Sequence, residues 1–171
     1  MKKDFIAIKD LSCTELEQLI QAAHKLKIRQ KKGIPFKPLE GKSLGMIFHK
    51  PSARTRISFD VGMYQLGGHN LILTEQEIGF GKRESIYDLA QLFSRMMDIV
   101  MIRTFHHNDV LELAHHATIP VINGLTDYNH PCQILADLLT LFESGKSFKH
   151  LKVVFVGDGN NVCMSWFSAA A

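Results

Sequence analysis

The sequence predicts an α/β fold, with a parallel sheet and helices on both faces. Short apolar segments alternate with longer amphipathic ones from Lys42 onward, and this alternation is typical of parallel sheets whose strands are joined by helices. Arginines, histidines and hydroxyl residues directly follow several of the apolar segments. Because parallel strands end at one edge of a sheet and ligands bind at that edge, we expect these polar residues to meet there.

The first element is expected to be a helix that begins after Ser12. Ser12 and Glu15 form a capping-box pattern, apolar residues then recur at helical spacing, and Gly33 with Pro35 ends the helix. Strand–helix units follow, identified by apolar periodicity and by breaking residues. The expected strands are 43–48, 70–73, 99–102, 120–122 and 153–156, and the expected helices are 57–66, 85–97, 109–117, 131–143 and 163–171, with a loop before residue 85.

Composition argues against several classes of function. The chain has 171 residues, 46% hydrophobic and 22% charged, as in soluble globular proteins. A net charge of +3 is too small to indicate nucleic-acid binding, and the basic run 25–32 is most simply a solvated helix end. No apolar segment approaches the ~20 residues that span a bilayer. Three cysteines without a C-x-x-C pattern favour a reducing compartment, so we expect a cytoplasmic protein with neither nucleic acid nor membrane as a partner.

An anion site is expected where the 43–48 strand meets the next helix. A helix start carries unpaired N–H groups and the positive end of the helix dipole. Ser52, Arg54 and Thr55 add hydroxyl and guanidinium donors that suit a phosphate group. A capped helix with a solvated basic end explains the same segment, so both interpretations stay open on this segment alone.

A second group of polar residues favours the anion interpretation. The segment His130–Gln133 follows the 120–122 strand, and Arg103 follows the 99–102 strand. Each has a structural alternative. His130 stands before a proline, which is typical of a helix start, and Arg103 has Asp98 and Asp127 as candidate ion-pair partners.

Neither a cofactor nor a metal ion is expected. Residues 153–161 contain G-x-G after a strand, but Val162 stands where a dinucleotide fingerprint has its third glycine. The adjacent histidines at 106–107 and 115–116 point about 100° apart on a helix, which is unsuitable for chelation. Cys132 has no activating partner in the sequence and is interpreted as a packing residue.

Three segments together resemble the carbamoyltransferase superfamily, and the resemblance covers essentially the whole chain. The segments are 48–59, 101–105 and 123–137. Asn-Gly-Leu-Thr-Asp at 123–127 and Gly-Asp-Gly-Asn-Asn at 157–161 are similar to the ornithine carbamoyltransferase family and fit the aspartate family poorly.

The resemblance implies transfer of the carbamoyl group from carbamoyl phosphate to the side-chain amine of ornithine, which gives citrulline and phosphate in arginine metabolism and amino-acid biosynthesis. It implies a homotrimer and no cofactor. It also implies residue roles, with Arg54, Arg103 and His130 catalytic and Asn161 in contact with ornithine. The residues that would bind carbamoyl phosphate are Ser52, Ala53, Arg54, Thr55, Arg103, His130, Pro131, Cys132 and Gln133.

Within that set, the resemblance implies a division of labour. Ser52, Ala53, Arg54 and Thr55 would hold the phosphate. Thr55 would also converge with Arg103 and His130 on the carbonyl oxygen, and Gln133 would read the amino group with help from backbone carbonyls.

Two departures from the family pattern concern the ligand site. Ala53 stands where the family usually has a hydroxyl residue, so only its backbone N–H remains as a donor. Glu77 aligns with a family glutamine near carbamoyl phosphate, where a carboxylate is unfavourable unless paired. Lys82 or Arg83 is expected to be its partner, or a one-residue shift places Gln76 in the role instead.

The expected domains are a carbamoyl-phosphate-binding domain at 1–150 and the start of a truncated ornithine-binding domain at 151–171. Such a fragment is expected to be inactive by itself. Two other interpretations stay open: a domain that binds carbamoyl phosphate without turnover, and a carbamoyltransferase for aspartate or another amine.

Overall fold

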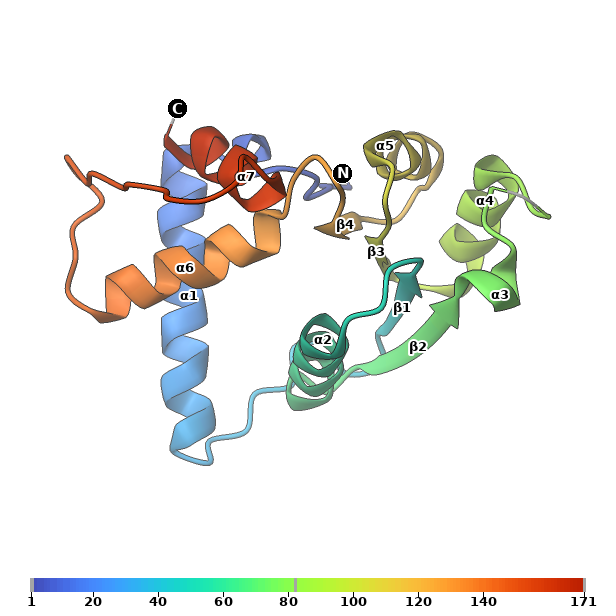
Figure 1. Ribbon diagram of the computed structural model, residues 1–171. Coiled ribbons are helices and arrows are strands. Elements are labelled where there is room, and N and C mark those ends of the chain that lie inside the picture. Colours follow the sequence, from blue (N-terminus) through green and yellow to red (C-terminus); the bar gives the residue numbers. More distant parts are fainter. Residues whose placement is uncertain (1, 82, 171) are drawn as a thin grey trace.

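A parallel four-stranded sheet forms the centre of the structure. The computed structural model describes residues 2–81 and 83–170. The strands run in the order β2-β1-β3-β4, and every neighbouring pair is parallel (Figure 1). The strand bounds are β1, Ser43–Phe48; β2, His69–Thr74; β3, Ile99–Arg103; and β4, Val121–Leu125. The expected parallel α/β sheet is therefore confirmed.

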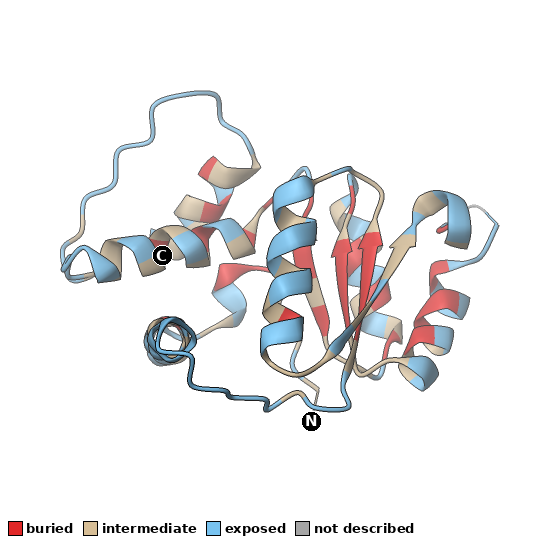
Figure 2. Cartoon of the chain, turned by 90° about the horizontal axis from the view of Figure 1, so that it is seen from below, coloured by how far each residue is buried: buried red, intermediate tan, exposed pale blue. Residues whose placement is uncertain are grey.

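Helices cover both faces of this sheet, because successive strand residues point to opposite sides. On one face Leu44, Met46 and Met101 pack with Met63 of α2 (Ala53–Gln65). On the other face the apolar side chains pack against α4 (Ile86–Met96) and α5 (His107–His116). The buried residues on that side include Ile47, Val100, Ile102, Leu89, Phe93, Val110 and Leu113. Figure 2 shows the buried strands between these helix layers.

A third group of helices lies beside β4. It consists of α1 (Cys13–Lys31), α6 (Pro131–Glu143) and α7 (Asn161–Ala170), which share an apolar cluster with the short 3-10 helix Ile8–Asp10. The N-terminal segment reaches the same strand, since the Phe5 N–H donates to Val121 O at 2.9 Å and the Asn123 N–H donates to Phe5 O at 2.8 Å. These contacts fix α7 and the N-terminus close to the loop between β4 and α6 (Figure 1).

Three local expectations differ from the structure. The helix expected at 57–66 begins earlier, at Ala53, because the Ser52 hydroxyl caps its N-terminus. The segment expected as a loop contains a four-residue helix, α3 (Glu75–Ile78), which begins with a capping box between Thr74 and Glu77. The strand expected at 153–156 is absent, and this expectation was wrong.

The missing strand has a physical reason. A strand is stabilised by hydrogen bonds to a neighbour, and the described part of this chain offers none to residues 153–156. Val154 and Val156 are accordingly 83% and 91% exposed. In Figure 2 the segment before α7 runs as an exposed loop away from the helices.

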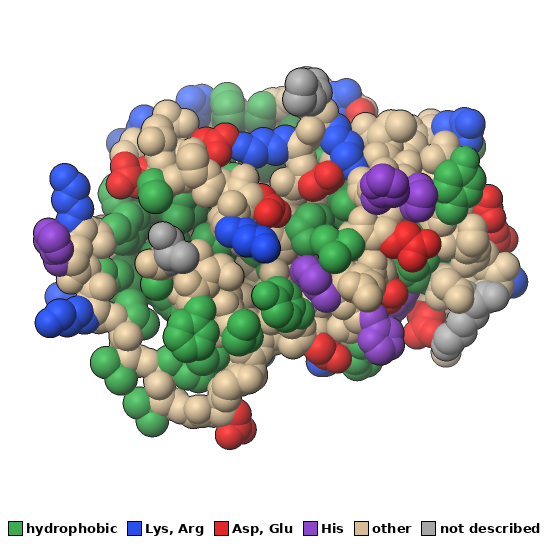
Figure 3. All heavy atoms as spheres, turned by 90° about the horizontal axis from the view of Figure 1, so that it is seen from above, with side chains coloured by type: hydrophobic (Ala, Val, Ile, Leu, Met, Phe, Trp, Pro, Cys, Tyr) green, Lys and Arg blue, Asp and Glu red, His purple; other side chains and the backbone are tan. Residues whose placement is uncertain are grey.

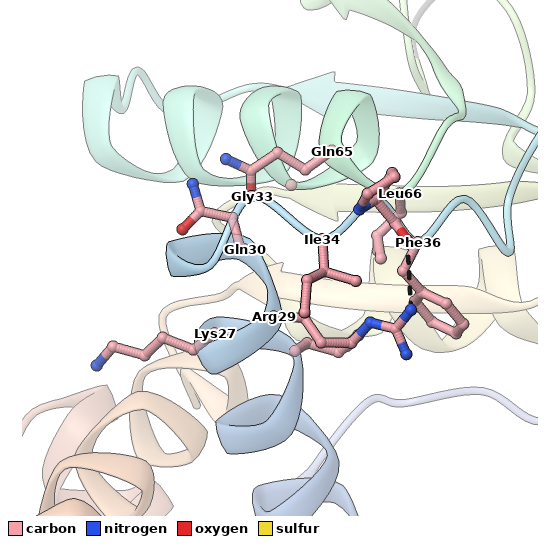
Figure 4. A pocket seen from close by; sticks show the side chains of 11 residues that line it. Lys27, Arg29, Gln30, Gly33, Ile34, Phe36, Gln65 and Leu66 are labelled. Carbon is pink, nitrogen blue, oxygen red and sulfur yellow. Dashed lines mark hydrogen bonds between the residues drawn. The ribbon is translucent and has the colours of Figure 1, made fainter.

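A surface pocket of about 420 Å³ lies between the C-terminal end of α1 and α2 (Figure 4). The Arg29 guanidinium group lies over the Phe36 ring at 4.8 Å and donates to Pro35 O at 3.3 Å. Ile34 and Leu66 give the pocket an apolar wall. None of the expected ligand-binding residues lines it; Ser52 and Ala53 lie at the opposite, N-terminal end of α2.

Candidate functional site

The start of α2 is capped by the hydroxyl of Ser52. The Ser52 hydroxyl accepts the Thr55 N–H at 3.2 Å and donates to Thr55 Oγ1 at 3.0 Å. Ala53 and Arg54 are the first residues of the helix, where N–H groups have no acceptor within the helix. These N–H groups and the helix dipole favour a negative ligand at this position.

Arg103 lies at the end of β3 and reaches the same helix start. Its Nε donates to Lys50 O at 3.2 Å, and its Nη1 donates to Thr55 Oγ1 at 3.4 Å. Burial, and secondarily the charge of Arg54, lower the pKa of Arg103. Two guanidinium groups thus lie close enough to repel each other beside an N-terminal helix end.

The ion-pair alternative for Arg103 is wrong. Asp98 pairs with Lys42 at 2.7 Å, and Asp127 pairs with Lys50 at 3.3 Å. Within residues 2–81 and 83–170, neither Arg54 nor Arg103 forms an ion pair. Figure 3 shows Lys, Arg and His side chains interspersed with Asp and Glu side chains on the face of the molecule seen from above. The positive charge beside α2 is therefore not neutralised by these carboxylates.

His130 occupies the N-cap position of α6, but its side chain makes no capping hydrogen bond. The helix start expected from Pro131 is present, since Pro131 is the first residue of α6, but the imidazole does not supply the cap. Its Nδ1 is buried and has no hydrogen-bond partner in the described residues. Burial, followed by the charge of Arg103, lowers the pKa of His130 to about 4, against a smaller opposing effect of Asp137. The imidazole is consequently neutral at neutral pH.

The other residues of the His130–Gln133 segment differ in how far they are buried. Gln133 is exposed, and its Nε2 donates to Asp137 Oδ1 at 2.9 Å. Pro131 is buried at the first position of α6. The Cys132 thiol donates to Asn123 O at 3.4 Å, and burial raises its pKa to about 12. A thiol in this state is a poor nucleophile, which supports its interpretation as a packing residue.

The residues after β2 form the short helix α3, which is capped by Thr74 and Glu77. The Glu77 carboxylate accepts the Thr74 N–H at 2.7 Å and the Thr74 hydroxyl at 2.8 Å, and these bonds lower the pKa of Glu77. Arg83 donates to the backbone oxygen of Glu77 at 2.7 Å rather than to its carboxylate. Gln76 is exposed on the same short helix. Lys82 lies outside the described residues.

Asn161 and a residue that sequence reasoning missed connect α7 to the site. The Asn161 amide donates to Thr126 O at 2.7 Å, and the Ser165 hydroxyl accepts the His130 N–H at 2.7 Å. A signal for Ser165 existed, because residues four apart on a helix share one face and Asn161 was already a candidate. Ser165 is 2% exposed.

The described residues contain no group of three or more His, Cys, Asp or Glu side chains arranged to hold a metal ion. None of their helices combines the length and apolar character that crossing a membrane requires.

Comparison with known proteins identifies the family. Residues 3–143 match the family described as "Aspartate/ornithine carbamoyltransferase, carbamoyl-P binding domain". The chain belongs to this carbamoyltransferase family. An ornithine carbamoyltransferase of Carboxydothermus hydrogenoformans is 54% identical over 169 residues, which are 99% of this chain and 54% of the relative. That of Syntrophus aciditrophicus is 52% identical over 171 residues, which are 100% of this chain and 57% of the relative.

Solved structures of the family agree with the fold. The ornithine carbamoyltransferase of Pyrococcus furiosus superposes with a TM-score of 0.95 at 48% identity, over 98% of this chain and 54% of that one. The enzyme of Burkholderia thailandensis gives 0.95 at 40% identity, over 98% of this chain and 58% of that one. The chain therefore spans about half the length of the carbamoyltransferases that it matches.

Proposed function

We propose that this chain is the carbamoyl-phosphate-binding half of an ornithine carbamoyltransferase. The observation that carries the proposal is the pair Arg54 and Arg103, which flank the start of α2 without a carboxylate partner in the described residues. A phosphate there would accept hydrogen bonds from the backbone N–H groups of Ala53 and Arg54. Its negative charge would also offset the repulsion between the two guanidinium groups. The names of the relatives supply ornithine as the second substrate.

The proposed reaction needs no covalent intermediate. The neutral side-chain amine of ornithine attacks the carbonyl carbon, the carbon–oxygen bond to phosphate breaks, and phosphate leaves with the electron pair while the nitrogen loses a proton. Negative charge develops on the carbonyl oxygen, where Thr55, Arg103 and His130 would donate. Gln133 would read the carbamoyl amino group after turning from its contact with Asp137. Positioning and electrostatics then supply the rate enhancement.

The tautomer of His130 suits this role. Its Nδ1 is buried without a partner, and a buried N–H without an acceptor is rarer than a buried acceptor without a donor. The proton of the neutral ring is accordingly assigned to Nε2, which becomes the donor for the carbonyl oxygen.

The wider assignments belong to the same proposal. A cytoplasmic homotrimer in arginine metabolism is the assembly proposed for the full-length protein. Apolar residues at helical spacing on the outer face of α2 support an association of subunits: Ile57, Val61 and Tyr64 are 60%, 45% and 78% exposed.

The test joins residues 1–171 to the remaining half of the Carboxydothermus relative and supplies labelled carbamoyl phosphate with either ornithine or aspartate. We expect labelled citrulline from ornithine only. Labelled carbamoyl aspartate in place of citrulline would show that the acceptor is aspartate and not ornithine. Tight binding of a phosphonate analogue without any product would support the binding-only interpretation instead.

A further inference from the structure

The loop that carries His130 is held from two sides by buried polar groups. Thr126 and Asn129 are 0% and 3% exposed, although they lie in a connection between β4 and α6. On the side of the N-terminal segment, Asn129 Nδ2 donates to Ile6 O at 3.2 Å. Asn129 Oδ1 accepts hydrogen bonds from the Asn123 amide and from the Thr126 hydroxyl. These contacts fix the middle of the loop but make no bond to His130 itself.

From the other side, α7 makes the contact to His130. The Ser165 hydroxyl donates to Asn161 O at 2.7 Å, one turn back on its own helix. Its single hydrogen is thereby used, so an oxygen lone pair remains for the His130 N–H, which donates to Ser165 Oγ at 2.7 Å. Asn161 contacts the opposite end of the loop, since its amide donates to Thr126 O at 2.7 Å.

The imidazole depends on this backbone contact because its buried Nδ1 makes no hydrogen bond in the described residues that would fix the direction of the ring. The charged groups that influence the ring, Arg103 and Asp137, act on it electrostatically. The direction of the ring therefore follows from the position of the His130 backbone. That position is set at the His130 N–H, where Ser165 is the acceptor.

We propose that Ser165 is a positioning residue for His130: its hydroxyl accepts the His130 N–H and so holds the imidazole toward Arg103 at the start of α2. The proposal rests on the proposed function for its chemical meaning. It makes α7 part of the carbamoyl-phosphate site through the backbone of His130.

The experiment uses the 171-residue chain and nuclear magnetic resonance. Ser165→Ala removes the acceptor, and Ser168→Ala is the matched control, because Ser168 lies one turn further on α7 and its hydroxyl reaches only Met164 O at 3.4 Å. We expect Ser165→Ala to speed hydrogen exchange of the His130 amide by roughly 2- to 10-fold, the effect of one neutral hydrogen bond. The imidazole signals and titration of His130 should shift as well, while Ser168→Ala leaves both unchanged.

Ser165→Cys provides a second variant, with a side chain of similar volume. It also weakens the contact to the His130 N–H, because sulfur is a weak acceptor. It replaces Ser165→Ala in the comparison if the alanine variant does not fold, and the same changes at His130 are expected. His130 signals that match the wild type in a folded Ser165 variant would overturn the proposal. A His130 amide that exchanges freely in the wild-type chain would also overturn it.

Calorimetry with a phosphonate analogue of carbamoyl phosphate separates this proposal from the proposed function. Shifted His130 signals in Ser165→Ala, with phosphonate binding by the wild type and little change in its affinity in Ser165→Ala, support both, because His130 is assigned to the carbonyl oxygen and not to the phosphate. Shifted His130 signals in a chain whose wild type does not bind the phosphonate would support the positioning role and contradict the proposed function. Normal binding and unchanged His130 signals in Ser165→Ala would contradict the positioning role alone.

Discussion

At the scale of single residues, two like charges lie near each other at the start of α2. Arg54 lowers the pKa of Arg103, and no carboxylate among the described residues pairs with either side chain. Folded proteins seldom leave a half-buried guanidinium group without a charged partner. The arrangement is explained if the ligand itself is the partner.

Arg54→Ala is expected to weaken binding of the phosphonate analogue by roughly 10- to 100-fold, because a charge-assisted hydrogen bond contributes ~1.5–3 kcal/mol. The fold should remain intact, since the Arg54 side chain is exposed. Calorimetry measures the affinity, and Arg95→Ala, an exposed arginine in the last turn of α4, is the control. Equal affinity in Arg54→Ala and Arg95→Ala would disprove the phosphate assignment.

His130 is expected to make the folded chain less stable in mild acid. Its pKa is lowered from 6.5 to about 4, so the unfolded chain binds a proton in this range that the folded chain does not. The contribution of His130 to stability is therefore full above the unfolded value and is lost as the pH falls from 6.5 toward 4. Urea titrations across this window should show a smaller loss for His130→Gln than for the wild type; equal slopes would contradict the shift.

His130→Ala in the joined full-length chain is expected to lower turnover by ~10²- to 10³-fold, the usual effect of removing one donor to a developing oxyanion. Affinity for carbamoyl phosphate should change much less, because His130 is assigned to the carbonyl oxygen and not to the phosphate. Steady-state kinetics with both substrates separates the two effects. A variant with normal turnover and reduced stability would assign His130 a structural role only.

At the scale of elements, the sequence was informative wherever apolar periodicity decides the structure. Strands β1 to β4 and the long helices lie close to their expected positions, because their buried side chains recur at a period that reports the element. Capping boxes were readable at Ser12, where Glu15 accepts the Ser12 N–H at 2.9 Å. Thr74 and Glu77 form the same pattern at the start of α3, but a loop was expected there.

Contacts between segments that are distant in the sequence could not be predicted from local patterns. The 153–156 segment has the composition of a strand, yet strand formation requires a neighbour that the described chain does not provide. The contact between Ser165 and the His130 N–H joins residues 35 positions apart, and no local pattern encodes that distance. The pKa of His130 likewise depends on burial by distant elements.

Glu77→Ala is expected to loosen α3 without weakening phosphonate binding. The Glu77 carboxylate accepts hydrogen bonds from the Thr74 N–H and hydroxyl, and its removal leaves the start of this short helix without both bonds of its capping box. Faster amide exchange at residues 75–78, with the exposed Gln76→Ala as a control, would report the loosening. A gain or loss of phosphonate affinity beyond about twofold would instead place Glu77 at the ligand, because twofold is within the effect of remote surface changes.

At the scale of the whole molecule, two parts of the chain differ in how well their apolar side chains are buried. The sheet and its covering helices bury a continuous apolar core. The segment before α7 leaves Val154 and Val156 almost fully exposed. Surface of this kind is usually covered in the functional protein, and the relatives are about twice as long as this chain. Coverage by their remaining half is the arrangement that we propose.

The final prediction follows from that division of the chain. The 171-residue chain should bind the phosphonate analogue but form no citrulline above the uncatalysed background. All residues assigned to phosphate and carbonyl lie between Ser52 and Gln133, whereas Asn161 is the single residue of this chain assigned to ornithine. Holding the amine against the carbonyl contributes up to ~7–11 kcal/mol to such two-substrate reactions, so most of the rate depends on groups that orient ornithine.

A labelled-carbamoyl assay on the purified chain tests this, with the chain joined to the Carboxydothermus half as the positive control. Activity is expected only in the joined protein, at unchanged phosphonate affinity, because the missing groups act on the amine and not on the phosphate. Citrulline formed by the 171-residue chain alone would mean that the residues from Ser52 to Asn161 suffice for both substrates. The division of the site between two halves would then be wrong.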